Sequence, residues 1–159
     1  MPKLEEYFLP AMDLVGLSTT TPSSMTAEFP VTDAIGLLWD EVLELTGVNP
    51  RTTLRFGLLH LLDDGLIEYH ACLRTNDYQG SGLSPFSFAG GYYICAEHEG
   101  DVATLPNSLR WFYGEYLPSS GYTLRPGWHI EMFDARFVPN AADSIMTFGA
   151  PAIRPAGQR

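Results

Sequence analysis

Glu131 is the residue of this sequence whose surroundings most need a chemical explanation. It lies in the stretch Gly127–Asp134, GWHIEMFD, in which Trp128, Ile130 and Met132 alternate on one side as they would in a β-strand. A buried carboxylate without a partner is expensive. Either a ligand of opposite charge reaches the acid, or an arginine or tyrosine hydroxyls of the chain satisfy it. The residues around it leave both explanations open.

Other residues with reactive side chains form no recognisable catalytic or metal-binding motif. The four histidines lie on different predicted elements without the spacing of a metal site, namely His60, His70, His98 and His129. No G-x-S-x-G, G-x-G-x-x-G or P-loop occurs. The sequence therefore predicts no metal and no cofactor.

Composition narrows the class of partner. With 45% hydrophobic and 18% charged residues the chain is typical of a globular domain, and its net charge is −10. Such a charge disfavours nucleic acids and anionic lipid and attracts cations. No apolar run approaches the ~20 residues of a membrane span, and the first ten residues do not resemble a signal peptide. Cys72 and Cys95 lie in apolar alternating stretches, which predicts free buried thiols in a reducing cytoplasm.

The elements that must position Glu131 follow from hydrophobic periodicity. A helix is predicted over about 32–46, capped by Thr32 or Asp33 and ended by Gly47. A second helix is predicted over about 104–117, with Pro106 in its first turn. The predicted strands are 12–19, 53–62, 66–74, 86–98, 128–137 and 144–153, with a turn-rich linker at 76–85.

This order of elements occurs twice, which predicts a duplicated fold. A shift of 74 residues aligns Trp39 with Tyr113, Gly47 with Gly121, and Gly57 with Glu131. We therefore expect an α+β domain over residues 1–159. In it, two β-α-β-β units join into one antiparallel sheet with both helices on one face. The first repeat would span about 3–76, the linker about 77–85 and the second repeat about 86–155.

Three segments in order, GGYYICAEHEG, YGEYLPSSGY and HIEMF, resemble the GyrI-like small-molecule-binding domain. That domain is the effector-binding module of many AraC-type and MerR-type regulators. The resemblance covers about residues 12–154 and implies a ligand cleft between the two helices, over the central strands. The sequence departs from the pattern at Phe133, where a tyrosine is commoner, and at His70, where an acid often stands. No DNA-binding element precedes the domain, so we expect the binding module alone.

The resemblance also implies a site. Glu131 would point into the cleft together with His129 and Phe133, and Gly57, opposite it, would leave room for a flat ligand. Aromatic walls around a carboxylate suit a lipophilic organic cation. The walls expected from the resemblance are Trp39, Tyr69, Tyr93, Tyr113 and Phe133.

Three functions are compatible with that site. The first is a receptor that senses or sequesters a hydrophobic, cationic aromatic compound. The second is a hydrolase that opens the cyclopropane of DNA-alkylating natural products, with Glu131 activating water and Tyr69 or Tyr93 bonding the substrate carbonyl. The third is an interaction protein, by resemblance to members that protect or inhibit gyrase, in which the acidic surface binds the partner.

Overall fold

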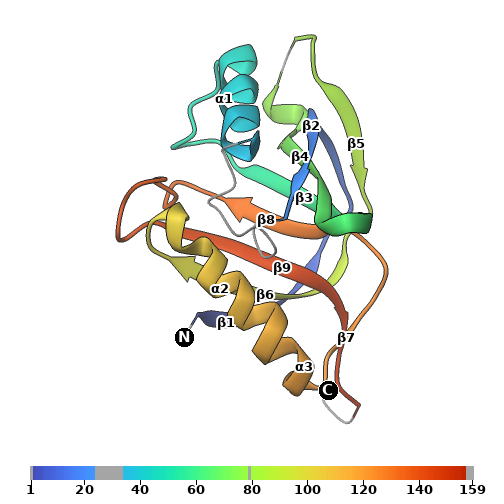
Figure 1. The fold of residues 1–159 in the computed structure, drawn as a ribbon. Coiled ribbons are helices and arrows are strands. Elements are labelled where there is room, and N and C mark those ends of the chain that lie inside the picture. Colours follow the sequence, from blue (N-terminus) through green and yellow to red (C-terminus); the bar gives the residue numbers. More distant parts are fainter. Residues whose placement is uncertain (1, 24–33, 79, 157–159) are drawn as a thin grey trace.

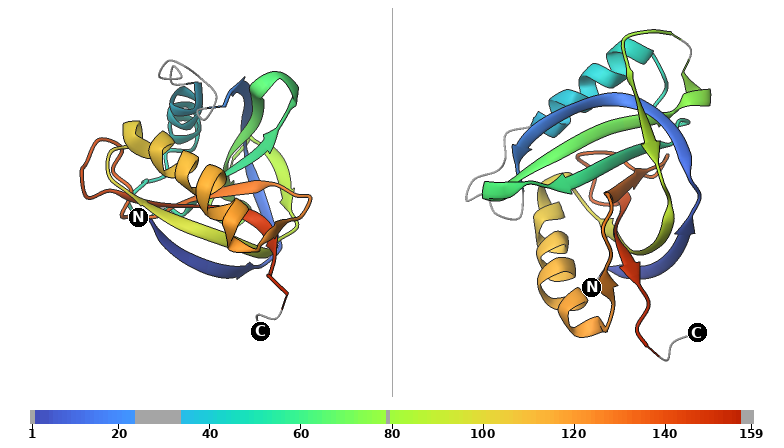
Figure 2. Two further views of the ribbon diagram at one scale, coloured as in Figure 1. Left: turned by 60° about the horizontal axis from the view of Figure 1, so that its bottom comes forward. Right: turned by 90° about the vertical axis from the view of Figure 1, so that its right-hand side faces the viewer.

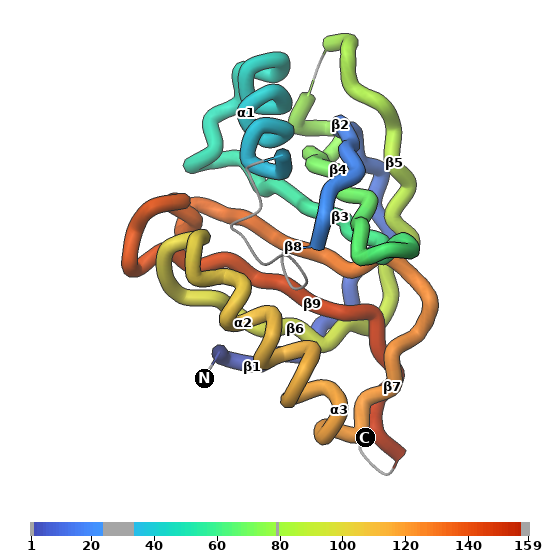
Figure 3. The backbone as a smooth tube through the Cα atoms, viewed as in Figure 1, coloured from blue at the N-terminus to red at the C-terminus, as the bar shows by residue number. Residues whose placement is uncertain are grey.

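The computed structural model describes residues 2–23, 34–78 and 80–156, and consists of one antiparallel sheet with helices packed against it (Figure 1; Figure 3). The strands are β1 (Lys3–Leu9), β2 (Met12–Pro22), β3 (Arg55–Leu61), β4 (Leu66–Arg74), β5 (Ser84–Phe88), β6 (Gly91–Glu99), β7 (Thr123–Leu124), β8 (His129–Phe133) and β9 (Ile145–Ile153). The helices are α1 (Ala34–Thr46), α2 (Leu105–Trp111) and α3 (Leu117–Ser120). Short 3₁₀ turns lie at Asp63–Gly65, Thr75–Asp77 and Val102–Thr104. Among these described residues no helix is long and apolar enough to cross a membrane.

The strand order of the sheet is β1-β6-β9-β8-β3-β4-β2-β5, and β7 pairs with β9. Along the chain β2, α1, β3 and β4 are followed later by β6, α2, β8 and β9 in the same arrangement. The predicted α+β class, with one antiparallel sheet and two helices on it, is confirmed. The two halves meet at the β3–β8 pair in the centre of the sheet.

Strand register shows that both helices cover the same face. Glu131 of β8 lies opposite Gly57 on one side and Phe148 on the other, and Gly57 lies opposite Ala71. Directly opposed residues of antiparallel strands point to the same face. Ala71 belongs to the cluster packed against α1, and Phe148 belongs to the cluster packed against α2. Glu131 therefore lies on the helix-covered face, between the two helices.

The edges of the sheet were not predicted correctly. β1 was not expected, and the strand predicted over 86–98 is two strands, β5 and β6, separated at Ala89 and Gly90. Gly90 has φ +73°, a left-handed conformation that suits glycine at this break. β5 begins inside the segment predicted as a linker. The predicted caps Thr32 and Asp33 lie outside the described residues.

Each half receives an edge strand from the other. β1 pairs with β6, and β5 pairs with β2, so the strand that precedes each unit closes the opposite unit (Figure 2). The face of the sheet away from the helices carries its own core, in which Leu14, Leu58 and Ile130 are at most 1% exposed. The expected free thiols, Cys72 and Cys95, are both buried in that core.

The second helix is interrupted by a wider turn. Between α2 and α3 the residues Phe112–Tyr116 form a π-helical turn, in which the N–H of Leu117 donates to the carbonyl of Phe112. Pro118 follows Leu117. Proline has no N–H to donate to a helical hydrogen bond, and its ring clashes with a carbonyl of the preceding helical turn, which favours a wider turn here. Gly121 ends the segment with φ +84°. The turn sets the direction in which Tyr113 leaves the helix.

Candidate functional site

Glu131 lies at the centre of the molecule, where the two halves of the sheet meet. Its Cα partner across the β3–β8 pair is Gly57, the residue that the 74-residue shift aligns with it. A residue opposed to its own repeat mate lies on the axis that relates the two units. The Glu131 side chain is only 7% exposed, so its charge has little access to water.

A chain of two hydrogen bonds connects α1 to this carboxylate. The Tyr69 hydroxyl donates to Glu131 Oε1 over 2.7 Å, and Trp39 Nε1 donates to the Tyr69 oxygen over 2.9 Å. Tyr69 has no exposed surface. Of the two explanations for the acid, satisfaction by a tyrosine hydroxyl is therefore realised in this structure.

Gly57 makes room for that hydroxyl. A Cβ at position 57 would overlap the Tyr69 hydroxyl and lie 2.8 Å from Glu131 Oε1. We expected the missing side chain to leave room for a flat ligand, but the space holds the Tyr69 phenol. The predicted cleft is closed around Glu131 by the chain's own side chains.

The carboxylate has no cationic partner among the described residues. Arg55 lies nearby, with its guanidinium 5.7 Å from the Phe133 ring centre, but it donates to the carbonyls of Pro50 and Asp134. Burial raises the pKa of Glu131 from 4.5 to about 7, although the Tyr69 hydrogen bond acts in the opposite direction. Burial, followed by the charge of Glu131, also raises the pKa of Tyr69 well above its usual value. The acid is thus held close to its titration point at neutral pH.

Two of the aromatic residues predicted as walls, Trp39 and Phe133, contact each other on the α1 side. The rings of Trp39 and Phe133 meet edge to face with centroids 5.5 Å apart. Phe133 also packs against Phe137 at 4.8 Å. Phe133 has no hydroxyl group, so this side of the acid is bordered by a bare hydrocarbon ring.

On the α2 side the contact is between Tyr113 and His129. The Tyr113 hydroxyl lies 2.7 Å from His129 Nδ1. Burial lowers the pKa of His129 to about 4, so the ring is neutral at pH 7, and its tautomer decides whether Nδ1 or the hydroxyl is the donor. Burial and then the charge of Glu131 raise the pKa of Tyr113. The sequence placed His129 on the same side as Glu131, but no pattern signalled its bond to Tyr113.

The structure does not bring Tyr93 to Glu131. Tyr93 lies opposite Pro151 on β9, whereas Glu131 lies opposite Phe148, and positions of odd and even number on β9 point to different faces. Tyr93 packs in the core on the face away from the helices and donates to the carbonyl of Trp128 over 2.6 Å. Its expected role as a wall, or as a hydroxyl donor to a substrate, does not fit this position.

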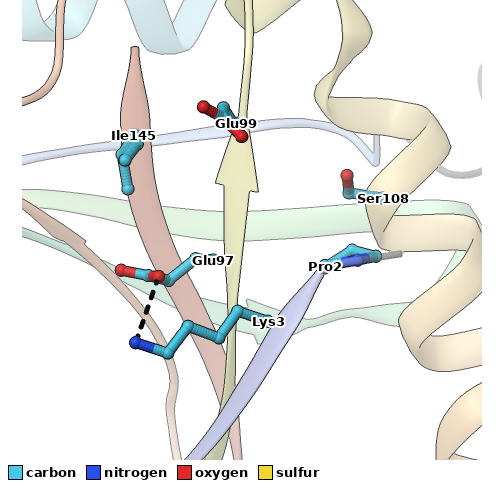
Figure 4. A pocket seen from close by; sticks show the side chains of 6 residues that line it. All are labelled: Pro2, Lys3, Glu97, Glu99, Ser108 and Ile145. Carbon is cyan, nitrogen blue, oxygen red and sulfur yellow. Dashed lines mark ion pairs between the residues drawn. The ribbon is translucent and has the colours of Figure 1, made fainter. Parts of the chain in front are cut away.

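Two cavities of the described residues have linings that do not include Glu131. One, of about 370 Å³, lies between the start of β1 and α2, and its lining is Pro2, Lys3, Glu97, Glu99, Ser108 and Ile145 (Figure 4). Its Lys3 and Glu97 form an ion pair at 3.9 Å, and it contains none of the predicted site residues. A second, of about 220 Å³, borders Tyr113. In the described ranges no group of three or more His, Cys, Asp or Glu side chains could hold a metal ion.

Solved structures share this fold at low sequence identity. SAV2435 bound to tetraphenylphosphonium is 15% identical with a TM-score of 0.65, covering 96% of this chain and 94% of that chain. The EcmrR C-terminal domain is 14% identical with a TM-score of 0.63, covering 97% and 98%. A hydrolase from Listeria innocua is 14% identical with a TM-score of 0.53, covering 95% and 92%. Comparison with curated proteins gives no match.

The family comparison agrees with this shared fold. The profile of the GyrI-like small molecule binding domain matches residues 3–147, which include all the strands from β1 to β8 and both helical segments. The chain belongs to the family of GyrI-like small molecule binding domains.

Proposed function

We propose that this domain binds lipophilic aromatic cations at Glu131, with Trp39, Tyr69, Tyr113 and Phe133 as the walls of the site. The observation that carries the proposal is a carboxylate 7% exposed whose hydrogen-bond partner is a neutral phenol. The structure contains a negative charge and aromatic rings in one desolvated place, and a cation is the missing complement. The neighbour SAV2435, which binds tetraphenylphosphonium, supports this ligand class.

The physical advantage of such a site is mutual. An organic cation with its charge spread over aromatic groups loses little hydration on burial, and ring faces contribute about 0.5–2 kcal/mol each. The carboxylate, which burial penalises, gains a counter-charge where the effective dielectric constant is low. Binding should therefore favour the ionised form of Glu131 and strengthen as the pH rises through about 7.

Binding requires side chains to move. Tyr69 and Phe133 occupy the space beside Glu131 and are both buried. A ligand must replace the Tyr69 hydrogen bond and separate Trp39 from Tyr69. The closed arrangement is then the unliganded member of a two-state equilibrium that the ligand shifts.

The decisive experiment is calorimetric titration with tetraphenylphosphonium at pH 8, where Glu131 is mostly ionised. Glu131→Gln keeps the shape and an oxygen acceptor for Tyr69 but removes the charge, so we expect its Kd to rise tenfold or more, about 1.4 kcal/mol. Glu44→Gln, on the exposed side of α1, is the matched control and should leave the Kd unchanged. Equal affinity of the Glu131→Gln variant and the wild type would contradict the proposal.

A hydrolase is the second candidate, because a carboxyl with a pKa of about 7 suits a general base. In that reaction Glu131 takes a proton from a water molecule while the water oxygen attacks a cyclopropane carbon. The carbon–carbon bond breaks toward a conjugated carbonyl, whose oxygen receives the hydrogen bond of Tyr69, and the proton returns to the product. Incubation with a cyclopropane-bearing alkylator distinguishes the candidates by mass. A water adduct that Glu131→Gln abolishes supports the hydrolase, and intact compound bound to the protein supports the receptor.

The cytoplasm is the compartment we infer for either function. Cys72 and Cys95 are both free and buried, so the fold uses reduced thiols as small apolar side chains. Burial raises the pKa of each to about 12, which keeps both in the unreactive thiol form.

A further inference from the structure

A small apolar pocket lies where the π-helical turn and α3 pass β7. Its volume is about 220 Å³, and it is lined by Tyr113, Leu117, Pro118, Tyr122 and Leu124. None of these side chains is charged, and the hydroxyls of Tyr113 and Tyr122 are already hydrogen-bonded to His129 and Glu6, so the pocket offers mainly apolar surface. Leu124 is 46% exposed although it is apolar, and it stands at the border between the pocket and solvent. An apolar group would gain from removal of this surface from water.

Tyr113 belongs both to this pocket and to the surroundings of Glu131. Its ring lines the pocket, and its hydroxyl contacts His129, two residues from Glu131 on the same strand and the same side. The negative charge of Glu131 acts on the Tyr113 phenol. One side chain therefore connects an apolar pocket to a buried acid.

Tyr113 is held by the hydrogen bond to His129, by ring contacts with Phe112 and His129, and by the irregular turn that carries it. Gly114, next to it, has open space around its Cα, and the turn lacks regular α-helical bonding. π-Helical turns occur frequently at functional sites.

We propose that this pocket receives the apolar tail of a cation whose charged head lies beside Glu131. Tyr113, which borders both places, contacts the ligand where its head and tail join. The ligand class is then narrower than aromatic cations in general: amphiphilic cations with an alkyl chain or a flexible apolar arm. This inference rests on the proposed function. It adds a second binding region, with a different chemistry, to the first.

The test compares three probes that share a head and differ in tail length: methyl-, butyl- and dodecyltriphenylphosphonium. We expect the wild-type protein to bind the dodecyl compound at least tenfold more tightly than the methyl compound. Leu124→Trp fills the pocket from its exposed border and should reduce this ratio to near one, without weakening the methyl compound. Leu61→Trp, at another exposed leucine, on β3 and 68% exposed against 46% for Leu124, is the control and should keep the wild-type ratio.

Leu124→Glu is a second variant, which introduces a charge into the pocket without bulk and should reduce the ratio in the same way. An unchanged ratio in both Leu124 variants overturns the pocket proposal. A different outcome is that the Leu124 variants change the ratio of affinities, but Glu131→Gln binds the methyl compound as tightly as the wild type does. The pocket and the acid then act independently, and the proposed connection between them is overturned. Failure of all three probes to bind the wild-type protein overturns this inference and the proposed function together.

Discussion

The two sides of Glu131 are built from corresponding positions but behave differently. On the α1 side, Trp39 donates to Tyr69, and Tyr69 donates to the carboxylate. On the α2 side, Tyr113, which the 74-residue shift aligns with Trp39, is hydrogen-bonded to His129. The first series of bonds ends on the acid, whereas the second ends on a neutral imidazole.

The difference shows how a repeated fold makes an asymmetric site. The axis between the halves passes through a pair of opposed residues, and one of them is an acid while the other is Gly57. The missing side chain at Gly57 admits the Tyr69 hydroxyl, which gives the acid its bond from the α1 side. The α2 side remains free of the carboxylate and faces an apolar pocket. In the proposed binding mode, the charged and apolar parts of the ligand would therefore lie in separate places.

The largest expected effect comes from removal of the acid itself. The unfolded chain carries Glu131 with a pKa near 4.5 and the folded protein near 7. Below pH 4.5 the acid is neutral in both states. Between 4.5 and 7 the unfolded state loses its proton first, so the free energy of unfolding falls as the pH rises. Glu131→Gln should therefore be more stable than the wild type by on the order of 3 kcal/mol at pH 8 and equal to it near pH 4, by urea denaturation. A stability difference between the variant and the wild type that stays constant from pH 4 to pH 8 would contradict the raised pKa of the buried acid.

The next largest effect is expected for Gly57→Ala, which adds a side chain opposite Glu131. The new Cβ overlaps the Tyr69 hydroxyl, so the phenol must move and its bond to Glu131 breaks. We expect a loss of about 2–3 kcal/mol in the free energy of unfolding. Gly114→Ala, where the added Cβ meets open space, is the matched control and should cost nothing.

A smaller effect should follow from Tyr69→Phe, which removes the bond on the α1 side but keeps the ring. At pH 8 the ionised acid loses its donor, and we expect a loss of about 2 kcal/mol. The pKa of Glu131 should also rise, because that hydrogen bond lowers it. NMR titration of the Glu131 carboxyl carbon measures the second consequence, and an unmoved titration curve would contradict it.

The smallest effect should be that of Tyr113→Phe. It removes a hydrogen bond between neutral groups, worth about 1 kcal/mol. The titration of Glu131 should change far less than in Tyr69→Phe, since the lost hydroxyl does not contact the acid. Equal shifts in the two variants would show that the sides of the site are equivalent.

The centre of this fold could be predicted from the sequence, whereas its edges could not. The alignment of Gly57 with Glu131 anticipated two residues that lie opposite each other, because a repeat with twofold arrangement brings corresponding positions together at its axis. The pairing of β1 with β6 depends on contacts between distant segments, which no local pattern records.

The face on which Tyr69 lies could be predicted because β4 alternates between half-buried and buried side chains from Leu66 to Ala71. The face of Tyr93 could not, because β6 is buried on both faces: Tyr93 and Ile94 are 1% and 2% exposed. A strand without a polar side offers no signal of which face lies under the helices. The Tyr69 hydroxyl over Gly57 was unpredictable for a different reason, since it depends on packing across three strands.

The exchange of edge strands has a consequence for how the chain reaches its native state. Each half lacks the strand that closes it, so neither half could complete its sheet in isolation. Cleavage in the exposed segment near Ser81 should leave two fragments that fold only by reassociation, each covering the open edge of the other. In the intact chain, pairs such as Tyr7 with Tyr93 close very large loops, so folding should be slow for a protein of this length.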